Sequence, residues 1–336
     1  MILRSVTAAV LLAGAAACSP PPAADPPRQY GFALPAWTVS DYASKKAPAY
    51  VEALAATGAR WIQFTPTWYQ RTARSSDIHR TEESASDESL RAVIALARRH
   101  GLKVLLKPHV DLPDDQDRAE IRPRDPAEWF ASYRAFIVHY AELAASAGVE
   151  QFAVGTELAG VSGHRAEWLE VISRVRAGFK GELVYAANYD AYANVAFWDK
   201  VDLIGIDAYW PLASRPTRSV TALKNAWTPH VEELSALSAA YGKKILFTEA
   251  GYTSQHGTVT EPYSWTVSKT RDDREQAAAY EALLATFSQK EWWAGVLFWM
   301  WDDWPGSEAT PRSLAYTPHG KPAEKVARAY FTRGGT

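Results

Sequence analysis

Two glutamates lie at the ends of short apolar runs, where a carboxylate could take part in chemistry. Glu157 belongs to "QFAVGTEL" and Glu249 to "KILFTEAGY", and each is preceded by a threonine and lies near a glycine. A buried carboxylate is costly unless it is paired, so both positions call for a partner or a ligand. A retaining glycosidase needs two carboxyl groups about 5 to 5.5 Å apart, one as nucleophile and one as acid/base. The pair predicts this chemistry if the fold brings both groups together, whereas either glutamate alone could be a structural hydrogen-bond acceptor or ion-pair partner.

Candidate substrate-binding residues follow the same kind of run. The chain has 14 tryptophans and 16 tyrosines but only 2 methionines. Flat aromatic faces with a polar handle suit sugar rings, although a tryptophan-rich core would use the same residues. The residues expected to line a ligand pocket are Trp37, Trp68, Lys107, His109, Asn188, Tyr209, Trp210, Trp299 and Trp301.

Three of these candidates have a specific alternative. Tyr209 is placed to hydrogen-bond Glu249 but could be a core tyrosine, and Lys107 could neutralise a carboxylate as readily as reach a sugar hydroxyl. His109 could be satisfied by a neighbouring carbonyl group. The sequence has no HExxH motif and no paired histidine spacing, so we expect neither a metal ion nor a cofactor.

Eight apolar or aromatic runs would position these residues. The runs are "YGFALPAW", "ARWIQFTP", "KVLLKPHV", "QFAVGTEL", "ELVYAANY", "VDLIGIDAY", "KILFTEAGY" and "AGVLFWMW". Most are separated by stretches with helical periodicity, one of which begins with an Asp125-Pro126 cap and continues to Gly148. Strand and helix alternating eight times over about 300 residues is typical of an α/β fold, the (β/α)8 TIM barrel.

We expect one barrel domain over residues 29–336. A doubly wound open sheet is the alternative, but its Gly-rich phosphate turn is absent from "GFALPAWTVSD". Active sites of such barrels lie at the C-terminal ends of the strands, so Glu157 and Glu249, ending strands four and seven, would face each other across the mouth. The long loop 253–273 after strand seven is expected to wall the substrate site and to decide between endo and exo action.

The N-terminal segment predicts export and anchoring. Residues 1–18 combine Arg4, an apolar stretch and small residues up to Cys18, the only cysteine. We interpret them as a lipoprotein-type signal peptide with Cys18 lipidated after cleavage, although an ordinary signal peptide with an incidental cysteine is the alternative. Residues 19–28 form a proline-rich tether. The chain would then be a lipoprotein of the bacterial cell envelope.

The charge balance restricts the partners. The formal net charge is −2 and the pI is near 6.5, which excludes the basic footprint of a nucleic-acid-binding protein. The expected partners are a polysaccharide or oligosaccharide substrate and, through the lipid anchor, a membrane. We expect a monomer.

Several motifs in one order resemble a known family. "LLKPHVD", "GTEL", "IDAYWPL", "FTEAGY" and "FWMWDD" resemble glycoside hydrolase family 113, retaining β-mannanases built on a (β/α)8 barrel with catalytic glutamates after strands four and seven. The likeness runs from Gly31 to about Asp303. The resemblance implies that Glu157 is the acid/base and Glu249 the nucleophile, and it suggests β-1,4-linked mannan as substrate.

The resemblance leaves some points open. Most of the wider clan has an asparagine before the acid/base glutamate to hold the sugar 2-hydroxyl, and here that position is Thr156. Asn188 or His109 could take over that role. The same machinery could act on another β-glycan, such as a glucan or a cell-wall amino sugar polymer. A lipid-anchored barrel that binds glycans without cleaving them is the alternative from another class.

Overall fold

The computed structural model describes residues 28–113, 116–301 and 312–333. The predicted signal peptide, Cys18 and all of the tether except Arg28 lie outside the described residues. In the described part, no helix is both long and apolar enough to cross a membrane.

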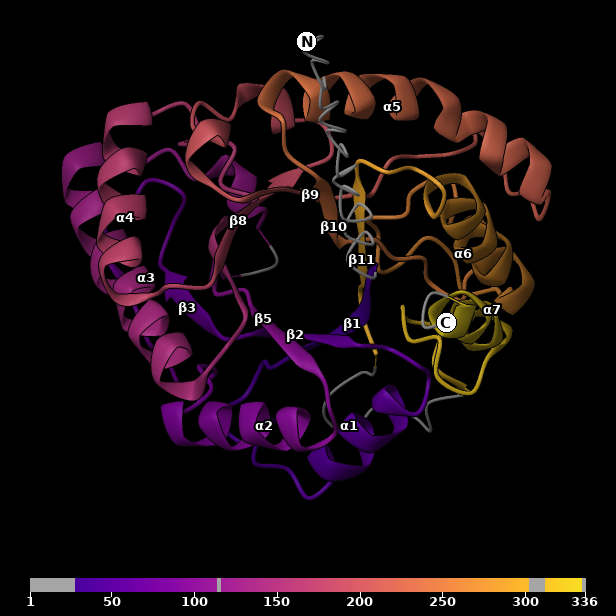
Figure 1. Cartoon of the computed structure of the whole chain (residues 1–336), viewed down its shortest axis with the longest axis horizontal. Coiled ribbons are helices and arrows are strands. Elements are labelled where there is room, and N and C mark those ends of the chain that lie inside the picture. Colours follow the sequence, from indigo (N-terminus) through magenta and orange to yellow (C-terminus); the bar gives the residue numbers. More distant parts are fainter. Residues whose placement is uncertain (1–27, 114–115, 302–311, 334–336) are drawn as a thin grey trace, which may run out of the picture.

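Eight parallel strands close into a barrel in the order β1-β11-β10-β9-β8-β7-β5-β2, surrounded by helices (Figure 1). All eight correspond to the runs found in the sequence, and the predicted (β/α)8 fold is confirmed. The barrel strands are β1 (Gln29–Pro35), β2 (Trp61–Thr65), β5 (Lys103–Leu106), β7 (Gln151–Thr156), β8 (Glu182–Asn188), β9 (Leu203–Asp207), β10 (Ile245–Glu249) and β11 (Trp293–Phe298).

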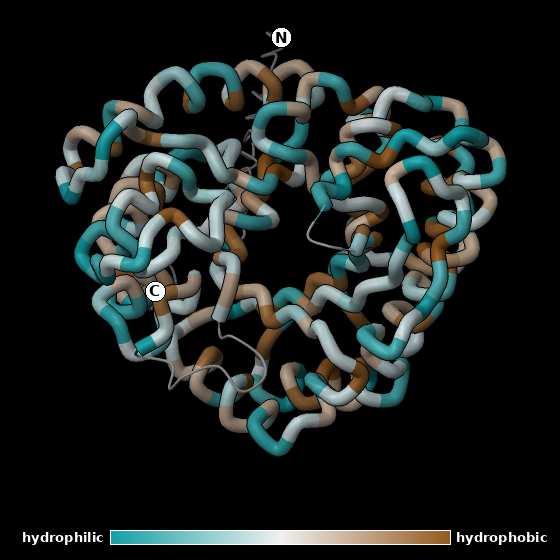
Figure 2. Tube along the Cα trace, turned by 180° about the vertical axis from the view of Figure 1, so that it is seen from behind, coloured by the Kyte–Doolittle hydropathy of each residue, from teal (hydrophilic) through white to brown (hydrophobic). Residues whose placement is uncertain are grey.

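Helices surround the barrel, and most of them lie in the stretches whose periodicity predicts a helix. The helices are α1 (Ala47–Ala55), α2 (Asp87–Arg99), α3 (Pro126–Ala147), α4 (Arg165–Gly178), α5 (Val220–Tyr241), α6 (Asp273–Phe287) and α7 (Pro322–Arg333). The Asp125 side chain accepts a hydrogen bond from the Glu128 backbone N–H at the start of α3, and Gly148 ends that helix with a positive φ of 68°. In Figure 2 hydropathy alternates along the helices, as expected for amphipathic helices with one face on the barrel.

Two local features depart from the regular barrel. Between β8 and β9 the chain forms two short 3-10 helices, η2 (Tyr192–Asn194) and η3 (Trp198–Lys200), in place of an α-helix. A small second sheet, β4-β3-β6, lies beside the barrel. Its strands are β3 (Thr67–Gln70), β4 (Ile78–His79) and β6 (His109–Asp111). The second sheet extends the protein surface that follows β2 and β5, next to the C-terminal ends of the barrel strands.

The barrel interior changes from apolar to polar along the strands. Near the strand starts, a separate buried cluster consists of Trp61, Leu105, Ala153, Val184, Leu203, Leu246, Ala294 and Leu297. Side chains two or four residues further along a strand share its face. On that basis Gln63 follows Trp61, Lys107 follows Leu105 and Asp207 follows Leu203, and all three are fully buried. An apolar plug therefore supports a polar layer at the C-terminal ends.

Candidate active site

The two glutamates lie at the ends of the fourth and seventh barrel strands, as predicted. Glu157 directly follows β7 and Glu249 is the last residue of β10. Glu157 has a φ of 53°, a left-handed conformation that non-glycine residues rarely adopt. Its backbone N–H donates to the Ala186 carbonyl on β8 at 2.8 Å, which holds this conformation. Such conformations persist where the surrounding structure fixes them, most often at functional sites.

The small residues Ala250 and Gly251 after Glu249 allow the ends of β10 and β11 to come close together. A Cβ on Gly251 would lie 2.4 Å from the Trp299 carbonyl oxygen, closer than any real contact. The Trp299 backbone N–H donates to the Ala250 carbonyl at 2.9 Å. The "EAG" sequence thus brings Trp299, which follows β11, beside Glu249.

Glu249 is held by a cation and a hydroxyl. It is 4% exposed. The Lys107 ammonium donates to its Oε1 at 2.5 Å, and the Tyr209 hydroxyl donates to its Oε2 at 2.7 Å. The predicted contact between Tyr209 and Glu249 is confirmed. Each of its two carboxylate oxygens therefore has a hydrogen-bond donor.

A second carboxylate shares the same cation. The Lys107 ammonium also donates to both oxygens of Asp207, at 3.1 and 3.0 Å, and the Thr248 hydroxyl donates to Asp207 Oδ1 at 2.7 Å. Lys107 and Asp207 are fully buried. Of the two interpretations of Lys107, its contacts support the ion-pair partner, and its role in substrate binding stays a prediction.

Glu157 has a different set of partners. The Arg118 guanidinium donates to its Oε2 at 2.6 Å, and the Asn188 amide donates to its Oε1 at 3.3 Å. Arg118 is itself oriented by Asp111, which accepts a hydrogen bond from its Nε at 2.8 Å. Asp111 therefore orients Arg118 toward Glu157.

Burial and neighbouring charges change the pKa values of several groups in the site. Burial raises the pKa of Glu157 to about 8, with a further rise from Asp207 and Glu249 that Arg118 partly offsets. Burial also raises the pKa of Asp207 to about 6, against the lowering effect of Lys107. Burial alone would lower the pKa of Lys107, but attraction to Asp207 and Glu249 raises it above the ordinary value, so the group stays charged. At neutral pH Glu157 is mostly protonated.

His109 contributes a neutral ring. Burial, together with the charges of Arg118 and Lys107, holds its pKa well below the ordinary value. Its Nε2 has no hydrogen-bond partner among the described residues and lies 3.9 Å from Glu249 Oε1. The imidazole is parallel to the Trp299 ring, with 6.2 Å between centroids and 12° between planes. An unpaired ring nitrogen beside Glu249 is available to a ligand hydroxyl.

Aromatic side chains form the rim around the glutamates. Trp37 makes edge contacts with Trp299 and with Trp265, with centroids 6.3 and 6.2 Å apart. Across the mouth, Tyr189 stacks parallel to Tyr263 at 6.4 Å. Trp265 and Tyr263 belong to the loop after β10 and are 44% and 51% exposed. The predicted loop 253–273 thus contacts rim residues that follow β1 and β8.

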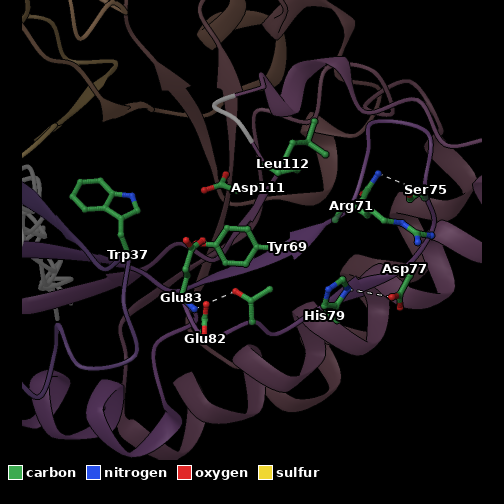
Figure 3. A pocket seen from close by; sticks show the side chains of 13 residues that line it. Trp37, Tyr69, Arg71, Ser75, Asp77, His79, Glu82, Glu83, Asp111 and Leu112 are labelled. Atoms are coloured by element: carbon green, nitrogen blue, oxygen red, sulfur yellow. Dashed lines mark hydrogen bonds and ion pairs between the residues drawn. The ribbon is translucent and has the colours of Figure 1, made fainter.

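A groove continues from this rim over the small sheet. Figure 3 shows its side chains, among them Trp37, Tyr69 and Asp111, around a cavity of about 930 Å³. Asp111 and Trp37 also adjoin the glutamate site, since they contact Arg118 and Trp299. The groove leads away from Glu157 and is large enough for sugar rings.

Three tryptophans predicted to line the site pack against the core. Trp301 is fully buried and stacks on His319 at 4.6 Å. Trp210 is 6% exposed and packs on His230 at 4.9 Å, in the layer between barrel and helices. Trp68 donates its indole N–H to the Tyr140 hydroxyl at 2.9 Å and packs on α3. Trp301 and Trp210 are thus buried in the core, whereas Trp68 is partly buried and packs against it.

Residues missed by the sequence analysis include Arg118, Asp207 and Trp265. Asp207 was visible as a strand-end residue in "IDAYW", but its partner could not be read from its own strand. Arg118 lies on the short η1 helix (Arg118–Glu120), where no strand-end rule applies. Trp265 lies in the middle of the 253–273 loop, which was predicted as a wall without any particular residue.

One other cluster could be considered for a metal ion. Ligand atoms of His256, Asp272 and Glu275 lie within 4.8 Å of one another. Both Asp272 oxygens already accept from Arg218, at 2.8 to 2.9 Å, and Glu275 accepts from the Gly257 backbone N–H at 2.9 Å. Since the arginine already neutralises Asp272, we assign this cluster the role of tying the loop after β10 to α6.

Comparisons with known proteins agree with this architecture. The family model described as Glycoside Hydrolase Family 113 matches residues 30–321. A family 113 β-mannanase from Alicyclobacillus acidocaldarius in complex with ManMIm is 29% identical, with a TM-score of 0.84 over 93% of this chain and 99% of that one. A structure described as a complex of a family 113 β-1,4-mannanase is 26% identical, with a TM-score of 0.83 over 91% and 99% of the two chains.

A more distant neighbour shares the fold alone. A Streptomyces cattleya protein of family GH5_18, in complex with Manβ1-4GlcNAc, is 16% identical with a TM-score of 0.62, over 93% of this chain and 81% of that one. No curated protein sequence matches this chain.

Proposed function

Because the chain belongs to glycoside hydrolase family 113, we propose that it is a retaining β-mannanase that cleaves β-1,4-linked mannan by double displacement. Glu249 is the nucleophile and Glu157 the acid/base. The observation that carries these roles is the contrast in their partners. Glu249 has the Lys107 ammonium at 2.5 Å, whereas burial and neighbouring carboxylates raise the pKa of Glu157 to about 8.

The first step needs an ionised nucleophile and a protonated acid. Glu249 attacks the anomeric carbon, and Glu157 gives its proton to the departing glycosidic oxygen, so that a glycosyl ester forms as the glycosidic bond breaks. The Tyr209 hydroxyl and the Lys107 ammonium fix the orientation of the Glu249 carboxylate. Arg118 and Asn188 hold Glu157 in place.

The second step needs the opposite protonation state of Glu157. Once Glu249 is an ester, its negative charge is gone, and one of the influences that raise the Glu157 pKa disappears. Arg118, still in contact, then favours the carboxylate form. Ionised Glu157 takes a proton from the water that attacks the ester and releases the sugar.

The remaining residues of the mouth fit substrate positioning. We propose that Trp299 is the platform under the reacting sugar and that Trp37 lines an adjacent subsite. His109 is better placed than Asn188 to hold the 2-hydroxyl, because its unpaired Nε2 is on the Glu249 side whereas the Asn188 amide donates to Glu157. The groove of Figure 3 would take further sugar rings.

Glu249→Gln and Glu157→Gln test the proposal. Hydrolysis of β-1,4-mannan and manno-oligosaccharides should fall by about 10⁴-fold or more in Glu249→Gln, since the amide cannot form the glycosyl ester. Glu157→Gln should retain more activity on substrates whose leaving group needs no proton. Near-normal mannan hydrolysis by either variant contradicts the assignment. Hydrolysis of another β-glycan in place of mannan would change the substrate, and glycan binding without new reducing ends would make the chain a binding protein.

We also propose that Cys18 carries a lipid anchor and that the enzyme works, as a monomer, at the bacterial cell envelope. The support is the signal-like segment 1–18 with its terminal cysteine. Expression with a radiolabelled fatty acid should label the wild-type chain and not the Cys18→Ala variant. Equal labelling of both, or membrane extraction of the wild type by salt alone, would contradict an anchor at this residue.

A further inference from the structure

The N-terminal ends of the barrel strands form a second face, opposite the glutamates. We call this face, which surrounds a cavity of about 830 Å³, the barrel floor. It contains the first residues of several strands, such as Gln29 of β1 and Lys103 of β5. Its six cationic residues are Arg28, Arg60, Lys103, Arg176, Lys180 and Lys244.

Three carboxylates share the barrel floor, and two of them are already bound to arginines. Glu150 accepts from Arg98, which lies outside the floor cavity, at 2.6 Å, and Asp202 pairs with Arg176. Glu182 accepts from the Gln151 amide at 2.7 Å. Even without Lys244, the other five cations outnumber these three carboxylates, so the floor carries an excess of positive charge on a protein whose formal net charge is −2.

Three of the floor cations have contacts that orient them without a carboxylate. Arg28 donates to the Trp293 carbonyl, and Lys180 donates to the carbonyls of Arg176 and Ala177 at 2.7 and 3.0 Å. The Lys103 ammonium lies 5.5 Å from the centroid of the Trp61 ring. Carbonyl dipoles and an indole face orient these groups without neutralising them, so the floor keeps a positive field.

Helix ends explain only part of this positive charge. Cations near helix C-termini are favoured by the macrodipole, and Arg176 and Lys180 lie in and just after the last turn of α4. Arg28 and Lys103 instead adjoin the starts of β1 and β5. Strands carry little net dipole, so these two cations need another reason.

The position of the tether supplies that reason. The described chain begins at Arg28, on the barrel floor itself. Residues 19–27 separate it from Cys18, and a stretch of that length can span at most about 30 Å. A lipid on Cys18 would therefore hold the floor close to the bilayer surface, with the glutamate site on the far side.

We propose that the barrel floor docks on the anionic phospholipid headgroups of the membrane that holds the chain. Each lysine or arginine near an anionic bilayer surface adds to the attraction, which decays within a Debye length. Docking in this orientation directs the mouth and its groove away from the bilayer, where a long polysaccharide can enter. The biological setting rests on the proposed lipid anchor, but the charge of the floor does not, so the two can be tested apart.

Vesicle co-sedimentation tests the floor without the anchor. The chain from residue 19 onward contains the whole described barrel and carries no lipid. It is mixed with vesicles of phosphatidylcholine alone or of phosphatidylcholine with phosphatidylglycerol. We expect binding only to the vesicles with phosphatidylglycerol, weakening as salt is raised. Absence of binding, or equal binding to both kinds of vesicle, would overturn the proposal.

Two charge-reversal double variants, one on the floor and one outside it, test whether the floor is the membrane-binding surface. Arg60→Glu/Lys103→Glu should lower the partition coefficient by about tenfold or more. Lys45→Glu/Lys224→Glu makes the same change in net charge at two exposed lysines outside the floor and should have a much smaller effect. Equal losses in both pairs would show a net-charge effect and reject the floor as the docking face.

A replacement variant and a displacement measurement distinguish the remaining outcomes. If the reversal pair does not fold, Arg60→Gln/Lys103→Gln takes its place, with circular dichroism and hydrolysis of a soluble manno-oligosaccharide as folding checks. Displacement from the vesicles by inorganic phosphate at constant ionic strength would reveal a free-anion site and overturn docking on a membrane surface. Loss of Cys18 labelling with retained vesicle binding would reject only the anchor, and absence of mannan hydrolysis would reject only the enzymatic proposal.

Discussion

Lys103 and Lys107 lie at the two ends of strand β5 and experience opposite electrostatic environments. Lys103 begins the strand on the barrel floor and is exposed, with its ammonium over the Trp61 ring. Lys107 directly follows the strand, is fully buried, and binds Asp207 and Glu249. The same residue type, four positions apart, serves as a solvated surface charge at one end and as part of an ion triad at the other.

The difference teaches that each end of the barrel uses charge for a different purpose. At the mouth, charged groups are desolvated, so each depends strongly on its neighbours and the pKa values of Glu157 and Asp207 depart from their ordinary range. On the floor, water screens each charge, and single changes should matter little to stability or catalysis. The floor acts through the sum of its charges.

Substitution of Lys107 and of Lys103 is the most direct test of this comparison. Lys107→Met leaves Asp207 and Glu249 buried without their cation, so we expect the free energy of unfolding to fall by about 3 kcal/mol or more. We also expect kcat/KM on mannan to fall by roughly 100-fold or more, because the nucleophile loses a preorganised partner. Denaturant titration and initial rates measure both effects.

Lys103→Met is the matched control, on the same strand and with the same change of side chain. Its effect on unfolding should stay within about 0.5 kcal/mol, with unchanged hydrolysis of a soluble oligosaccharide. Similar losses in both variants would mean that the two ends do not differ as described.

The sequence predicted the barrel because its signals are local. Each barrel strand is a short apolar run between helical patterns, and Glu157 and Glu249 follow two of these runs, so their places at the mouth could be deduced from strand order. The contact of Tyr209 with Glu249 could be deduced in the same way, since β9 and β10 are neighbours.

The direction of individual side chains could not be predicted from the runs. Strands covered on both faces lack an alternating pattern, so nothing local distinguished Trp299 at the mouth from Trp301 in the core two residues later. The packing of Trp210 against the core and the pairing of Lys107 with Asp207 could not be predicted for the same reason. Arg118 reaches Glu157 from a loop, and such an approach depends on tertiary packing that no local pattern records.

The pH dependence of the reaction should distinguish Arg118, at the mouth of the barrel, from Arg176, on the floor. Glu157 must be protonated to act as the acid, so kcat/KM should fall as the pH rises through about 8, the pKa of this group. Arg118 lowers that pKa. In the plot of kcat/KM against pH, Arg118→Gln should therefore move the falling limb to higher pH by about one pH unit or more. A pH profile with a soluble substrate measures the shift.

Arg176→Gln provides the control for Arg118→Gln. Arg176 pairs with Asp202 on the floor and lies far along the barrel from the glutamates. Its removal should leave the falling limb where it is in the wild type. A limb that moves equally in both variants, or that moves to lower pH in Arg118→Gln, would contradict the electrostatic role of Arg118.

The free energy of unfolding should also depend on pH, because Glu157 at the mouth of the barrel has a raised pKa. The pKa of Glu157 is about 8 in the folded chain against 4.5 ordinarily, so between these values the folded state binds more protons than the unfolded state. Stability contributed by this group is therefore lost as the pH rises from about 4.5 to 8. Glu157→Gln cannot ionise, so its Tm relative to the wild type should increase by a few degrees between pH 5 and pH 8. A Tm difference that is constant or decreases over this interval would contradict the raised pKa.

The smallest expected effect concerns exposed aromatic residues at the two ends. Trp265 is 44% exposed on the rim near Trp37, and Tyr241 is 41% exposed at the end of α5, on the floor side of the barrel. An indole that stacks on a sugar ring contributes about 0.5 to 1.5 kcal/mol, so Trp265→Ala should raise KM for long manno-oligosaccharides by about threefold to tenfold. Because the ring is remote from the reacting carbon, kcat should change little. Tyr241→Ala removes a comparable exposed ring and should leave KM unchanged. An equal effect of the two substitutions, or an effect of Trp265→Ala on kcat alone, would mean that the loop after β10 supports the fold of the mouth without binding the polysaccharide.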